Sequence, residues 1–287
     1  MRVLIIGAEG FLGQKLFSIF SKSHETFGTS KDGKNFYRLD LTDKKRLYYI
    51  ANETSPEVII NAAGITDVDY CEENPELVKS ISGICIDNLL LTCAKHKCKL
   101  VHFSTDYIFD GKKGDYIESD EAYPVNVYGE MKLEQEKEII SSDANYIIPR
   151  VAVLYGYNSA KDKKTFVNWV IERLRQGESI SVADDQFVTP TIIDDVANAL
   201  KRLLEIGERG IFHVAGSECI SRHALAVKVA EVFNLDKSLI TPASSRKLMW
   251  KARRPMNSCL RTDKLNKLNI KMSNMNEGLS EMKRQMS

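Results

Sequence analysis

The stretch that decides the fold is VLIIGAEGFLG at residues 3–13, close to the start of the chain. Four successive apolar residues are typical of a strand buried on both faces, and residues 11–20 then carry apolar side chains at helical spacing. Between the two lie Gly7, Gly10 and Gly13. In this strand–turn–helix context the first glycine permits a tight turn, the second lets the backbone approach a pyrophosphate, and the third lets helix and strand pack closely. A glycine-rich turn without a ligand is the alternative.

Further apolar runs follow at residues 58–60, 100–103 and 147–154, each ending in small or polar residues, with helical patterns between them. Strands that are apolar throughout and separated by helices predict an α/β fold with a parallel sheet. We therefore expect a Rossmann-type, doubly wound NAD(P)-binding domain over residues 1–156. Pro149 is awkward in a central strand because it cannot donate to the ladder, so we expect a bulge or a late strand start there.

In the second half of the chain, strand and helix patterns alternate less regularly. Residues 166–175 and 194–204 read as helices, residues 211–214 as a strand, and residues 221–233 as a helix with Ser221 as its N-cap. The sequence contains no long linker. We expect residues 157–287 to form a smaller mixed α/β substrate domain, with segments that return to the first domain.

Composition excludes several classes of protein. The 40 Lys and Arg residues nearly balance the 39 Asp and Glu residues, which argues against a protein that coats nucleic acid or an anionic membrane. No apolar run approaches the roughly 18 residues of a membrane helix. Glu9 interrupts the first apolar run too early for a signal peptide. We therefore expect a cytoplasmic protein without nucleic-acid or membrane partners.

Cysteine and histidine spacing argues against a metal site and against a disulfide framework. The six cysteines form no CxxC pair, and we interpret them as reduced, mostly buried thiols. The five histidines show no metal-ligand spacing. His102 and His213 lie in apolar strands, so we expect them to be core residues with satisfied hydrogen bonds.

The second strand, around residues 25–28, should end near the adenosine ribose of a bound dinucleotide. An NAD-preferring site usually places Asp or Glu there, whereas this chain has Ser30 and Lys31. A hydroxyl and a cation suit a 2′-phosphate, so we expect NADPH, with NADH as the alternative. Lys31 as a solvated loop charge is the other interpretation, and the neighbouring Asp32 weakens the case.

A second adenosine-side element follows at residues 39–43. Asp40 and Leu41 are expected to flank the adenine ring. Alternatively, Thr42 or Asp43 merely caps the next helix.

Tyr128 and Lys132 carry the strongest signal for chemistry. Positions four apart share a helix face, so the phenol and the ammonium group can reach one site, where the ammonium lowers the pKa of the phenol. Such a tyrosine can exchange a proton near neutral pH. Thr105 lies just past a predicted buried strand, at the sheet edge where ligands meet open α/β folds. A surface Tyr–Lys pair is the alternative interpretation.

These motifs resemble the extended short-chain dehydrogenase/reductase family, and longer strings look like its dTDP-4-dehydrorhamnose reductase subfamily. The resemblance runs through residues 61–69, 104–111, 126–133, 185–191 and 254–265 in the family's order. It implies NADPH-dependent reduction, sometimes with NADH, of the 4-keto group of a nucleotide-linked deoxysugar, with dTDP-4-dehydro-L-rhamnose as the expected substrate. Relatives often form homodimers through helices that flank the tyrosine.

The resemblance also implies roles for single residues. Tyr128 is the proton donor, Lys132 lowers its pKa and holds the nicotinamide ribose, and Thr105 hydrogen-bonds the reacting carbonyl. The expected cofactor contacts are Gly7, Gly10, Phe11, Leu12, Gly13, Ala62, Ala63 and Gly64. The expected substrate contacts are Thr66, Val68, Thr105, Asp106, Val153 and Arg254.

Several of these substrate contacts have plain alternatives. Val153 occupies a place where the family's reductases commonly have tryptophan, and a core residue is the favoured interpretation, since valine is usually buried. Arg254 suits a diphosphate because a guanidinium binds it bidentately, but a structural ion pair is as good an interpretation. Ser82 stands where many relatives have an asparagine.

The same superfamily includes a non-catalytic relative, the regulatory beta subunit of methionine adenosyltransferase, so the fold does not decide the function. A cofactor-bound partner subunit and a nucleotide-sugar epimerase are therefore alternatives. The complete set of Thr105, Tyr128 and Lys132 favours catalysis. An epimerase keeps its NAD(H) bound through turnover, whereas a reductase must release it.

Overall fold

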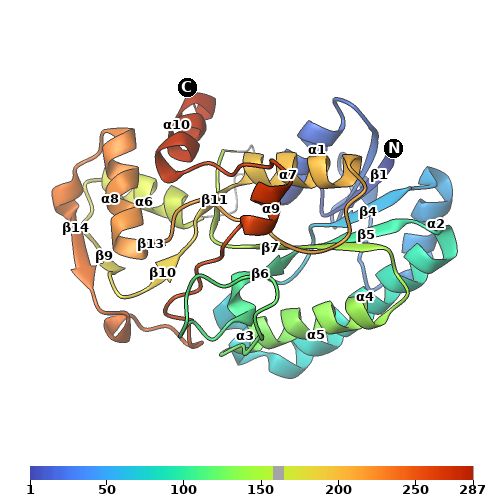
Figure 1. Cartoon of the computed structure of the whole chain (residues 1–287), viewed down its shortest axis with the longest axis horizontal. Coiled ribbons are helices and arrows are strands. Elements are labelled where there is room, and N and C mark those ends of the chain that lie inside the picture. The colour runs from blue at the N-terminus through green and yellow to red at the C-terminus, as the bar shows by residue number, and fades with distance from the viewer. Residues whose placement is uncertain (158–164, 287) are drawn as a thin grey trace.

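The computed structural model describes residues 1–157 and 165–286 (Figure 1). Within that part of the chain, eight strands form one parallel sheet in the order β12-β7-β5-β4-β1-β2-β3, with the short β6 also pairing with β7. The strands are β1 (Arg2–Ile6), β2 (Glu25–Ser30), β3 (Tyr37–Arg38), β4 (Val58–Asn61), β5 (Lys99–His102), β6 (Ser104–Thr105), β7 (Tyr146–Val151) and β12 (Gly210–His213). The expected Rossmann-type sheet is confirmed, because every pair in it is parallel.

Helices cover both faces of the sheet (Figure 1). On one face lie α1 (Phe11–Phe20) and α7 (Ile193–Glu205), and on the other lie α2 (Lys44–Thr54), α4 (Pro75–His96) and α5 (Val127–Ser141). The short α3 (Val68–Glu73) packs against α5. The central strands β1 and β4 are buried on both faces and are apolar at nearly every position, as the sequence pattern predicted.

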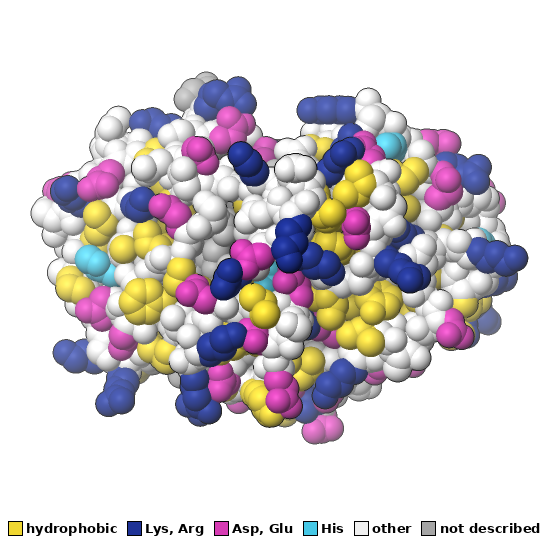
Figure 2. Space-filling view, in the orientation of Figure 1, with side chains coloured by type: hydrophobic (Ala, Val, Ile, Leu, Met, Phe, Trp, Pro, Cys, Tyr) yellow, Lys and Arg dark blue, Asp and Glu magenta, His cyan; other side chains and the backbone are white. Residues whose placement is uncertain are grey.

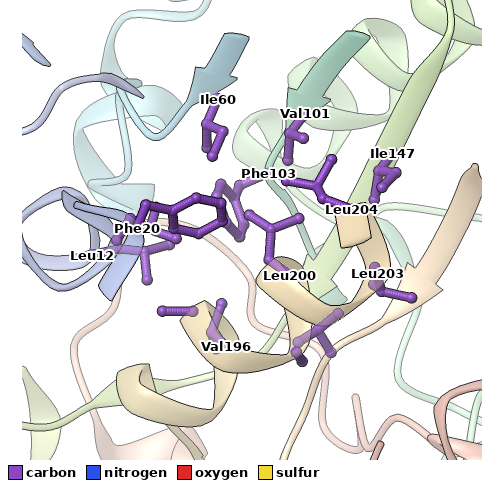
Figure 3. Close-up of a cluster of buried hydrophobic side chains, with 14 of the residues drawn as sticks. Leu12, Phe20, Ile60, Val101, Phe103, Ile147, Val196, Leu200, Leu203 and Leu204 are labelled. Carbon is purple, nitrogen blue, oxygen red and sulfur yellow. The ribbon is translucent and has the colours of Figure 1, made fainter. Parts of the chain in front are cut away.

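The hydrophobic core between α1, α7 and the sheet holds the two halves of the chain together (Figure 3). Leu12 and Phe20 reach in from α1, Leu200 and Leu203 from α7, and the strands contribute Ile60, Val101 and Ile147. Each fully buried side chain of this kind contributes roughly 1.5–3 kcal/mol relative to an exposed one. This packing places an element from beyond residue 156 against the first helix of the chain.

Pro149 corrects the sequence-based expectation, since it lies inside β7 rather than at a bulge or a strand start. β5 pairs with β7 at Tyr146 and Ile147, and β6 resumes the pairing at Arg150 with the same register offset. Pro149 therefore falls opposite the gap between β5 and β6. The missing proline N–H costs little there, because the ladder on that side is already interrupted.

The second half of the chain consists of short strand pairs and helices. The strands are β8 (Leu154–Tyr155) with β11 (Thr191–Ile192), β9 (Ile180–Ala183) with β14 (Ile240–Ala243), and β10 (Phe187–Val188) with β13 (Ile220–Ser221). The helices are α6 (Phe166–Arg175), α8 (Arg222–Phe233), α9 (Asp263–Lys267) and α10 (Met275–Met286), with 3-10 turns at Asp106–Ile108, Lys237–Leu239 and Ser245–Lys247. The predicted N-cap is confirmed: Ser221 Oγ accepts a hydrogen bond from the Ala224 N–H at 3.1 Å.

Two elements from this half lie in the large layered domain. β12 adds a strand beside β7, and α7 packs on α1. α9 in turn contacts β12. The domain boundary near residue 156 stays a prediction. The sheet and its helices include elements from both sides of that residue.

The cysteine interpretation needs a correction. Cys219 and Cys259 form a disulfide with their Cα atoms 5.6 Å apart, whereas Cys71, Cys85, Cys93 and Cys98 remain thiols. The pair lies 40 residues apart in sequence, so no local spacing signalled it. Only the approach of β13 to the segment after Pro255 brings the two cysteines together.

One helix corrects the expectation that no apolar segment approaches the length of a membrane helix. By length and composition alone, α4 is long and apolar enough to cross a membrane. In this fold α4 packs against α2, α3, α5 and β5 as one of the layer helices. Such a core helix is a weak indication of a membrane span.

Candidate active site

A cleft of about 650 Å³ opens at the carboxyl ends of β1, β4, β6 and β7. This is the edge of an open α/β sheet where ligands bind, next to the point where the strand order reverses between β1 and β4. Two further cavities adjoin it. One, of about 310 Å³, continues past β2, and the other, of about 360 Å³, lies under the second half of the chain.

The glycine turn has the shape that a pyrophosphate requires. Gly7 has a φ of +79°, in the left-handed region that favours glycine. A Cβ on Gly13 would lie 2.0 Å from the Gly7 carbonyl oxygen, so only glycine lets α1 pack this closely on β1. Gly10 is the N-cap of α1 and has no side chain to occupy the positive end of the helix. An anion can therefore approach the first turn of α1.

The smaller adjoining cavity lies at the end of β2, where the sequence predicted the adenosine side of a bound dinucleotide. It is lined by Ser30, Lys31, Asp40 and Leu41, and it shares the two residues of the β2 end with the main cleft. Asp43 caps α2 by accepting a hydrogen bond from the Arg46 N–H at 3.0 Å. The helix cap expected at Thr42 or Asp43 is therefore confirmed at Asp43, whereas the contact of Asp40 and Leu41 with an adenine ring stays a prediction.

Ser104 supplies an independent sign that the cleft takes a polar ligand. Its side chain is 3% exposed, lines the cleft, and its Oγ has no hydrogen-bond partner in the described chain. Buried hydroxyls are normally satisfied, so an orphan one facing a cleft marks a position for a ligand atom. Together with the glycine cradle, this fits a dinucleotide.

The three candidate catalytic residues meet on one side of the cleft. Thr105 ends β6, and Tyr128 and Lys132 lie on successive turns of α5, whose first turn is capped by Asn126 through the Gly129 N–H at 2.8 Å. A Cβ on Gly129 would lie 2.2 Å from the Tyr107 carbonyl oxygen, so glycine is needed to bring α5 against the turn after Thr105.

Burial has the largest effect on the electrostatics of this trio. Burial raises the pKa of Tyr128, and a hydrogen bond with Thr105 opposes that rise only in part. Burial lowers the pKa of Lys132 to about 8, with Glu136 acting against it. Lys132 Nζ donates to the Phe103 carbonyl oxygen at 3.0 Å. Burial dominates the pKa of Tyr128 in this structure, so the phenol keeps its proton at neutral pH, and the lowering of this pKa by Lys132 stays a prediction.

A buried histidine connects α5, which carries Tyr128 and Lys132, to the end of β4 through hydrogen bonds. His102 lies between Asn61 on β4 and Gln135 on α5, with ring nitrogens 3.2 Å from Asn61 Nδ2 and 3.1 Å from Gln135 Oε1. Asn61 Oδ1 in turn accepts from the Ala63 N–H at 3.2 Å. Burial lowers the pKa of His102 to about 3, so the ring stays neutral. The expectation of a satisfied core histidine is confirmed, as it is for His213, which lies 3.1 Å from the Tyr116 carbonyl oxygen.

Asp106 lies directly beside Thr105 and is 2% exposed. Thr105 Oγ1 donates to one carboxylate oxygen at 3.1 Å, and Ser258 Oγ donates to the other at 2.5 Å. Burial raises the pKa of Asp106 to about 6, while Ser258, Thr105 and Arg222 act against it. Both oxygens are therefore engaged by protein groups.

The 360 Å³ cavity has aromatic walls and two guanidinium groups, those of Arg222 and Arg254. It shares Tyr107 and Arg222 with the main cleft, so Arg222 lies where the two spaces join. Arg254 is paired with Asp69 at 2.9 Å. Arg222 instead lies 5.0 Å from the centre of the Phe166 ring, with no ion pair to another described residue.

Of the predicted site residues, the main cleft brings together Gly7, Gly10, Phe11, Leu12, Ser30, Lys31, Ala62, Ala63, Gly64, Thr66, Val68, Thr105, Asp106, Tyr128, Lys132 and Val153. Asp40 and Leu41 line the adenosine-side cavity, Arg254 lines the aromatic one, and Gly13 lies beneath the turn. Val153 has a φ of +38°, which is unusual for a β-branched residue. Ser82 Oγ donates to Met131 Sδ at 2.8 Å, on the helix that carries Lys132.

Several residues at the site were not among those predicted from the sequence. These are Phe103, Ser104, Tyr107, Phe166, Trp169, Gln186, Arg222, Leu248, Trp250 and Ser258. Ser104 and Tyr107 belong to the motif around Thr105, so that motif was the available signal. Arg222 follows the predicted N-cap Ser221 and had no signal of its own.

Charges on the surface show no single-sign field on the face seen in Figure 2, where acidic and basic side chains are interspersed. This agrees with the formal net charge of +1. No group of three or more potential metal ligands occurs among the residues that the structure describes.

Comparison with known proteins gives one family over the whole chain. The sequence profile of the RmlD substrate binding domain matches residues 1–287. A probable low-salt glycan biosynthesis reductase, Agl14, of Haloferax volcanii is 31% identical over 268 residues, covering 91% of this chain and 89% of that protein. The methionine adenosyltransferase 2 subunit beta of Mus musculus is 30% identical over 278 residues, covering 94% and 83%.

Solved structures agree. A dTDP-4-dehydrorhamnose reductase from Clostridium acetobutylicum is similar with a TM-score of 0.90 at 31% identity, covering 100% of this chain and 99% of the other. A dTDP-4-dehydrorhamnose reductase from Bacillus anthracis, solved in complex with NADP, is similar with a TM-score of 0.91 at 28% identity, covering 99% of each chain. The resemblance inferred from the motifs is thereby confirmed, and the chain belongs to the RmlD substrate binding domain family.

Proposed function

We propose that this protein is an oxidoreductase that uses NADPH to reduce the 4-keto group of a nucleotide-linked deoxysugar, with dTDP-4-dehydro-L-rhamnose as the substrate. The observation that carries the proposal is the convergence of Thr105, Tyr128 and Lys132 in one cleft with the glycine turn of Gly7. That cleft continues into an aromatic cavity at Arg222. On this proposal the cofactor binds at the glycine turn, the reacting sugar beside Tyr128, and the nucleotide in the aromatic cavity.

Tyr128 is suited to give a proton to the keto oxygen. Burial raises the pKa of its phenol, so the hydroxyl carries its proton at neutral pH. When bound, NADPH supplies the hydride that reaches sugar C4. Lys132, which Phe103 holds by its carbonyl oxygen at 3.0 Å, would hold the nicotinamide ribose and stabilise the phenolate that forms. Thr105 hydrogen-bonds the same keto oxygen.

The nucleotide part of the substrate is assigned to the aromatic cavity. Phe166, Trp169 and Trp250 offer flat apolar faces for a base, and Arg222 stands at the junction where a diphosphate would pass. Arg254 is already paired with Asp69 at 2.9 Å, so we assign the diphosphate first to Arg222. On this assignment the Arg254–Asp69 ion pair forms part of the wall of the aromatic cavity.

The preference for NADPH over NADH is assigned to the end of β2. Ser30 and Lys31 line both the main cleft and the adenosine-side cavity, where the 2′-position of the ribose would lie. Ser30 Oγ accepts a hydrogen bond from the Gly33 N–H at 2.9 Å, which holds the loop that carries Lys31. The Bacillus anthracis relative was solved with NADP, which supports this assignment.

The test is oxidation of NADPH, followed by its absorbance, with dTDP-4-dehydro-L-rhamnose generated in situ. Tyr128→Phe should lower turnover by a factor of roughly 100 or more while NADPH binding stays intact, the scale of lost general acid catalysis. Tyr123→Phe is the matched control, since Tyr123 is 57% exposed and lies outside the cleft. Turnover that is unchanged in Tyr128→Phe contradicts the assigned role.

A cofactor-bound partner subunit is the second candidate, favoured by the 30% identity to the methionine adenosyltransferase 2 subunit beta. On that interpretation NADPH binds but no keto-sugar is reduced, and a pull-down identifies the partner. A nucleotide-sugar epimerase is the third, and it would keep its NAD(H) bound through turnover. Exchange of labelled cofactor during turnover separates the epimerase from the reductase.

We also infer a homodimer through α4. Leu77, Ile84 and Leu91 are exposed on this helix at seven-residue spacing, with Ile84 midway. A twofold axis at Ile84 would place Leu77 of one copy opposite Leu91 of the other and bring the Glu76 end near the Lys95 end. The mass in solution, measured by light scattering, tests this.

The cytoplasmic location stays a prediction, and the Cys219–Cys259 disulfide removes the support that reduced thiols lent it.

A further inference from the structure

The buried carboxylate of Asp106 has no ion-pair partner among the described residues, although a buried charge is costly. Its oxygens are taken by two hydroxyl groups, those of Thr105 at 3.1 Å and Ser258 at 2.5 Å. An uncharged asparagine would be the cheaper way to join two hydroxyls in the interior. The carboxyl group therefore needs an explanation that packing does not supply.

The hydroxyl of Thr105 has one proton and more than one group that can accept it. Oγ1 accepts a hydrogen bond from the Tyr107 N–H at 3.2 Å and donates its proton to Asp106. The same hydroxyl interacts with the Tyr128 phenol. A carboxylate is the strongest acceptor of these, because a charge-assisted hydrogen bond is roughly twice as strong as a neutral one. While Asp106 is ionised, Thr105 therefore gives this proton to the carboxylate in preference to a keto oxygen, and its hydrogen bond to the substrate is weakened.

We propose that Asp106 is a positioning residue whose carboxyl group sets the direction of the Thr105 proton, and so decides whether Thr105 donates to the keto oxygen. This inference rests on the proposed function of the cleft. In the ionised form, Asp106 draws the Thr105 proton toward itself. In the neutral form, Asp106 donates its own proton to Thr105 Oγ1, and the Thr105 proton is free to point into the cleft.

The surroundings leave Asp106 as the group that titrates near pH 6. The charged and titratable groups that face it are Arg222 from α8, Tyr107 from its own turn and Tyr128 from α5. Burial raises the pKa of both phenols, so they remain neutral at that pH. Arg222 stays charged throughout, and Lys132, whose pKa burial lowers to about 8, is still charged at pH 6.

Ser258 extends the effect to the second half of the chain. Its side chain is fully buried, and its backbone N–H donates to the Phe187 carbonyl oxygen at 3.1 Å. Its hydroxyl favours the ionised form of Asp106, because a hydrogen bond to the carboxylate holds the pKa down. The segment that carries Ser258 therefore tunes the same carboxyl group that positions Thr105.

The test is the pH profile of kcat/KM with the keto-sugar and NADPH. For the wild type we expect kcat/KM to rise by roughly tenfold as pH falls through the pKa of Asp106, the scale of one hydrogen bond gained. We call this pH-dependent rise the limb of the profile. Asp106→Asn should remove the limb and keep kcat/KM at its low-pH value at every pH, with NADPH affinity unchanged. Ser258→Ala should move the limb to higher pH. Asp143→Asn, at an exposed carboxyl outside the cleft, is the control.

Thr105→Ser supplies a rescue control, because it keeps the hydroxyl and should keep the limb. A limb that persists in Asp106→Asn at the wild-type pH overturns the proposal, as does a Ser258→Ala profile with an unmoved midpoint. If Asp106→Asn does not fold, the Ser258→Ala profile and the Thr105→Ser profile decide.

A second readout does not depend on turnover. Infrared difference spectra of the NADPH complex, taken as the pH falls, should show the C=O stretch of one buried carboxylic acid. That band should be absent in Asp106→Asn and should appear at higher pH in Ser258→Ala. If the band behaves so but no keto-sugar is reduced, the proposed function fails while the titration of Asp106 stands. If the band is absent, the proposal for Asp106 fails whatever the activity.

Discussion

The two walls of the cleft are built in different ways. The cofactor wall, formed by the glycine turn, the ends of β4 and β6, and α5, consists of strand ends and helix starts from one continuous α/β layer. The substrate wall is the lining of the aromatic cavity, to which Gln186, Arg222 and Arg254 belong. These three residues lie in segments far apart in sequence, residues 186–188, 220–222 and 254–258. Backbone hydrogen bonds join these segments, including Phe187 N–H to the Met256 carbonyl oxygen at 2.7 Å.

Because the two walls are built differently, a single substitution should affect each of them in a different way. On the cofactor wall the sheet register sets each position, so a residue matters through its own shape or chemistry. On the substrate wall the position depends on cross-links between segments, and the Cys219–Cys259 disulfide is the covalent one. We expect damage to either wall to lower stability, but we expect damage to the cofactor wall to weaken NADPH binding and turnover, and damage to the substrate wall to raise KM for the keto-sugar.

The largest effect is expected at the cofactor wall, in Gly13→Ala. The new Cβ would lie 2.0 Å from the Gly7 carbonyl oxygen, and a backbone atom cannot move away as a side chain can. We expect a loss of about 3 kcal/mol in the free energy of unfolding, together with weaker NADPH binding. Gly83→Ala in α4 is the control, since no atom lies within 4 Å of a Cβ built there. Alanine should raise the free energy of unfolding at this helix position by about 0.5–1 kcal/mol. Urea unfolding measures both, and equal stability of the two variants would contradict the packing argument.

Removing the disulfide tests the substrate wall. Cys219→Ser with Cys259→Ser should lower the free energy of unfolding by about 2–4 kcal/mol, because the cross-link closes a 40-residue span of the unfolded chain. It should also raise KM for the keto-sugar and leave the affinity for NADPH unchanged. Non-reducing mass analysis first establishes the bond in the wild type. A change in NADPH affinity equal to the change in KM would remove the distinction between the walls.

A smaller effect is expected for Arg222→Ala. Loss of a charge-assisted hydrogen bond to a diphosphate costs about 1.5–3 kcal/mol, so KM should rise by roughly 10- to 100-fold with kcat nearly unchanged. Arg253→Ala, an exposed arginine that lines none of the three cavities described above, is the control. Steady-state kinetics at saturating NADPH measure both. If the two variants raise KM equally, Arg222 has no special place at the junction.

The smallest effect is expected for Val153→Gly. A β-branched residue at a φ of +38° is strained by about 1–3 kcal/mol, and glycine removes that strain while adding about 0.5–1 kcal/mol of unfolded-chain entropy cost. We expect a net gain of about 0.5–1 kcal/mol in the free energy of unfolding, measured with urea. A loss of stability would show that Val153 contributes more through packing than its backbone costs.

Local sequence determined much of the cofactor wall. Residues 3–13 predicted the first strand, the glycine turn and the start of α1, because buried strands are apolar throughout and only glycine tolerates the φ of Gly7 and the contact at Gly13. The spacing of Tyr128 and Lys132 similarly placed two groups on one face of α5. These are short-range consequences of strand and helix geometry, so they are readable from a single chain.

Only the tertiary structure decided the substrate wall and the protonation of the site. The pairing of Cys219 with Cys259, the contact of Ser258 with Asp106 and the position of Arg222 depend on segments that meet across long sequence separations. The pKa values of Tyr128 and Asp106 follow from burial rather than from the nearest charge in the sequence. Burial is a property of the assembled molecule, because desolvation depends on everything that packs around a group, and no motif records it.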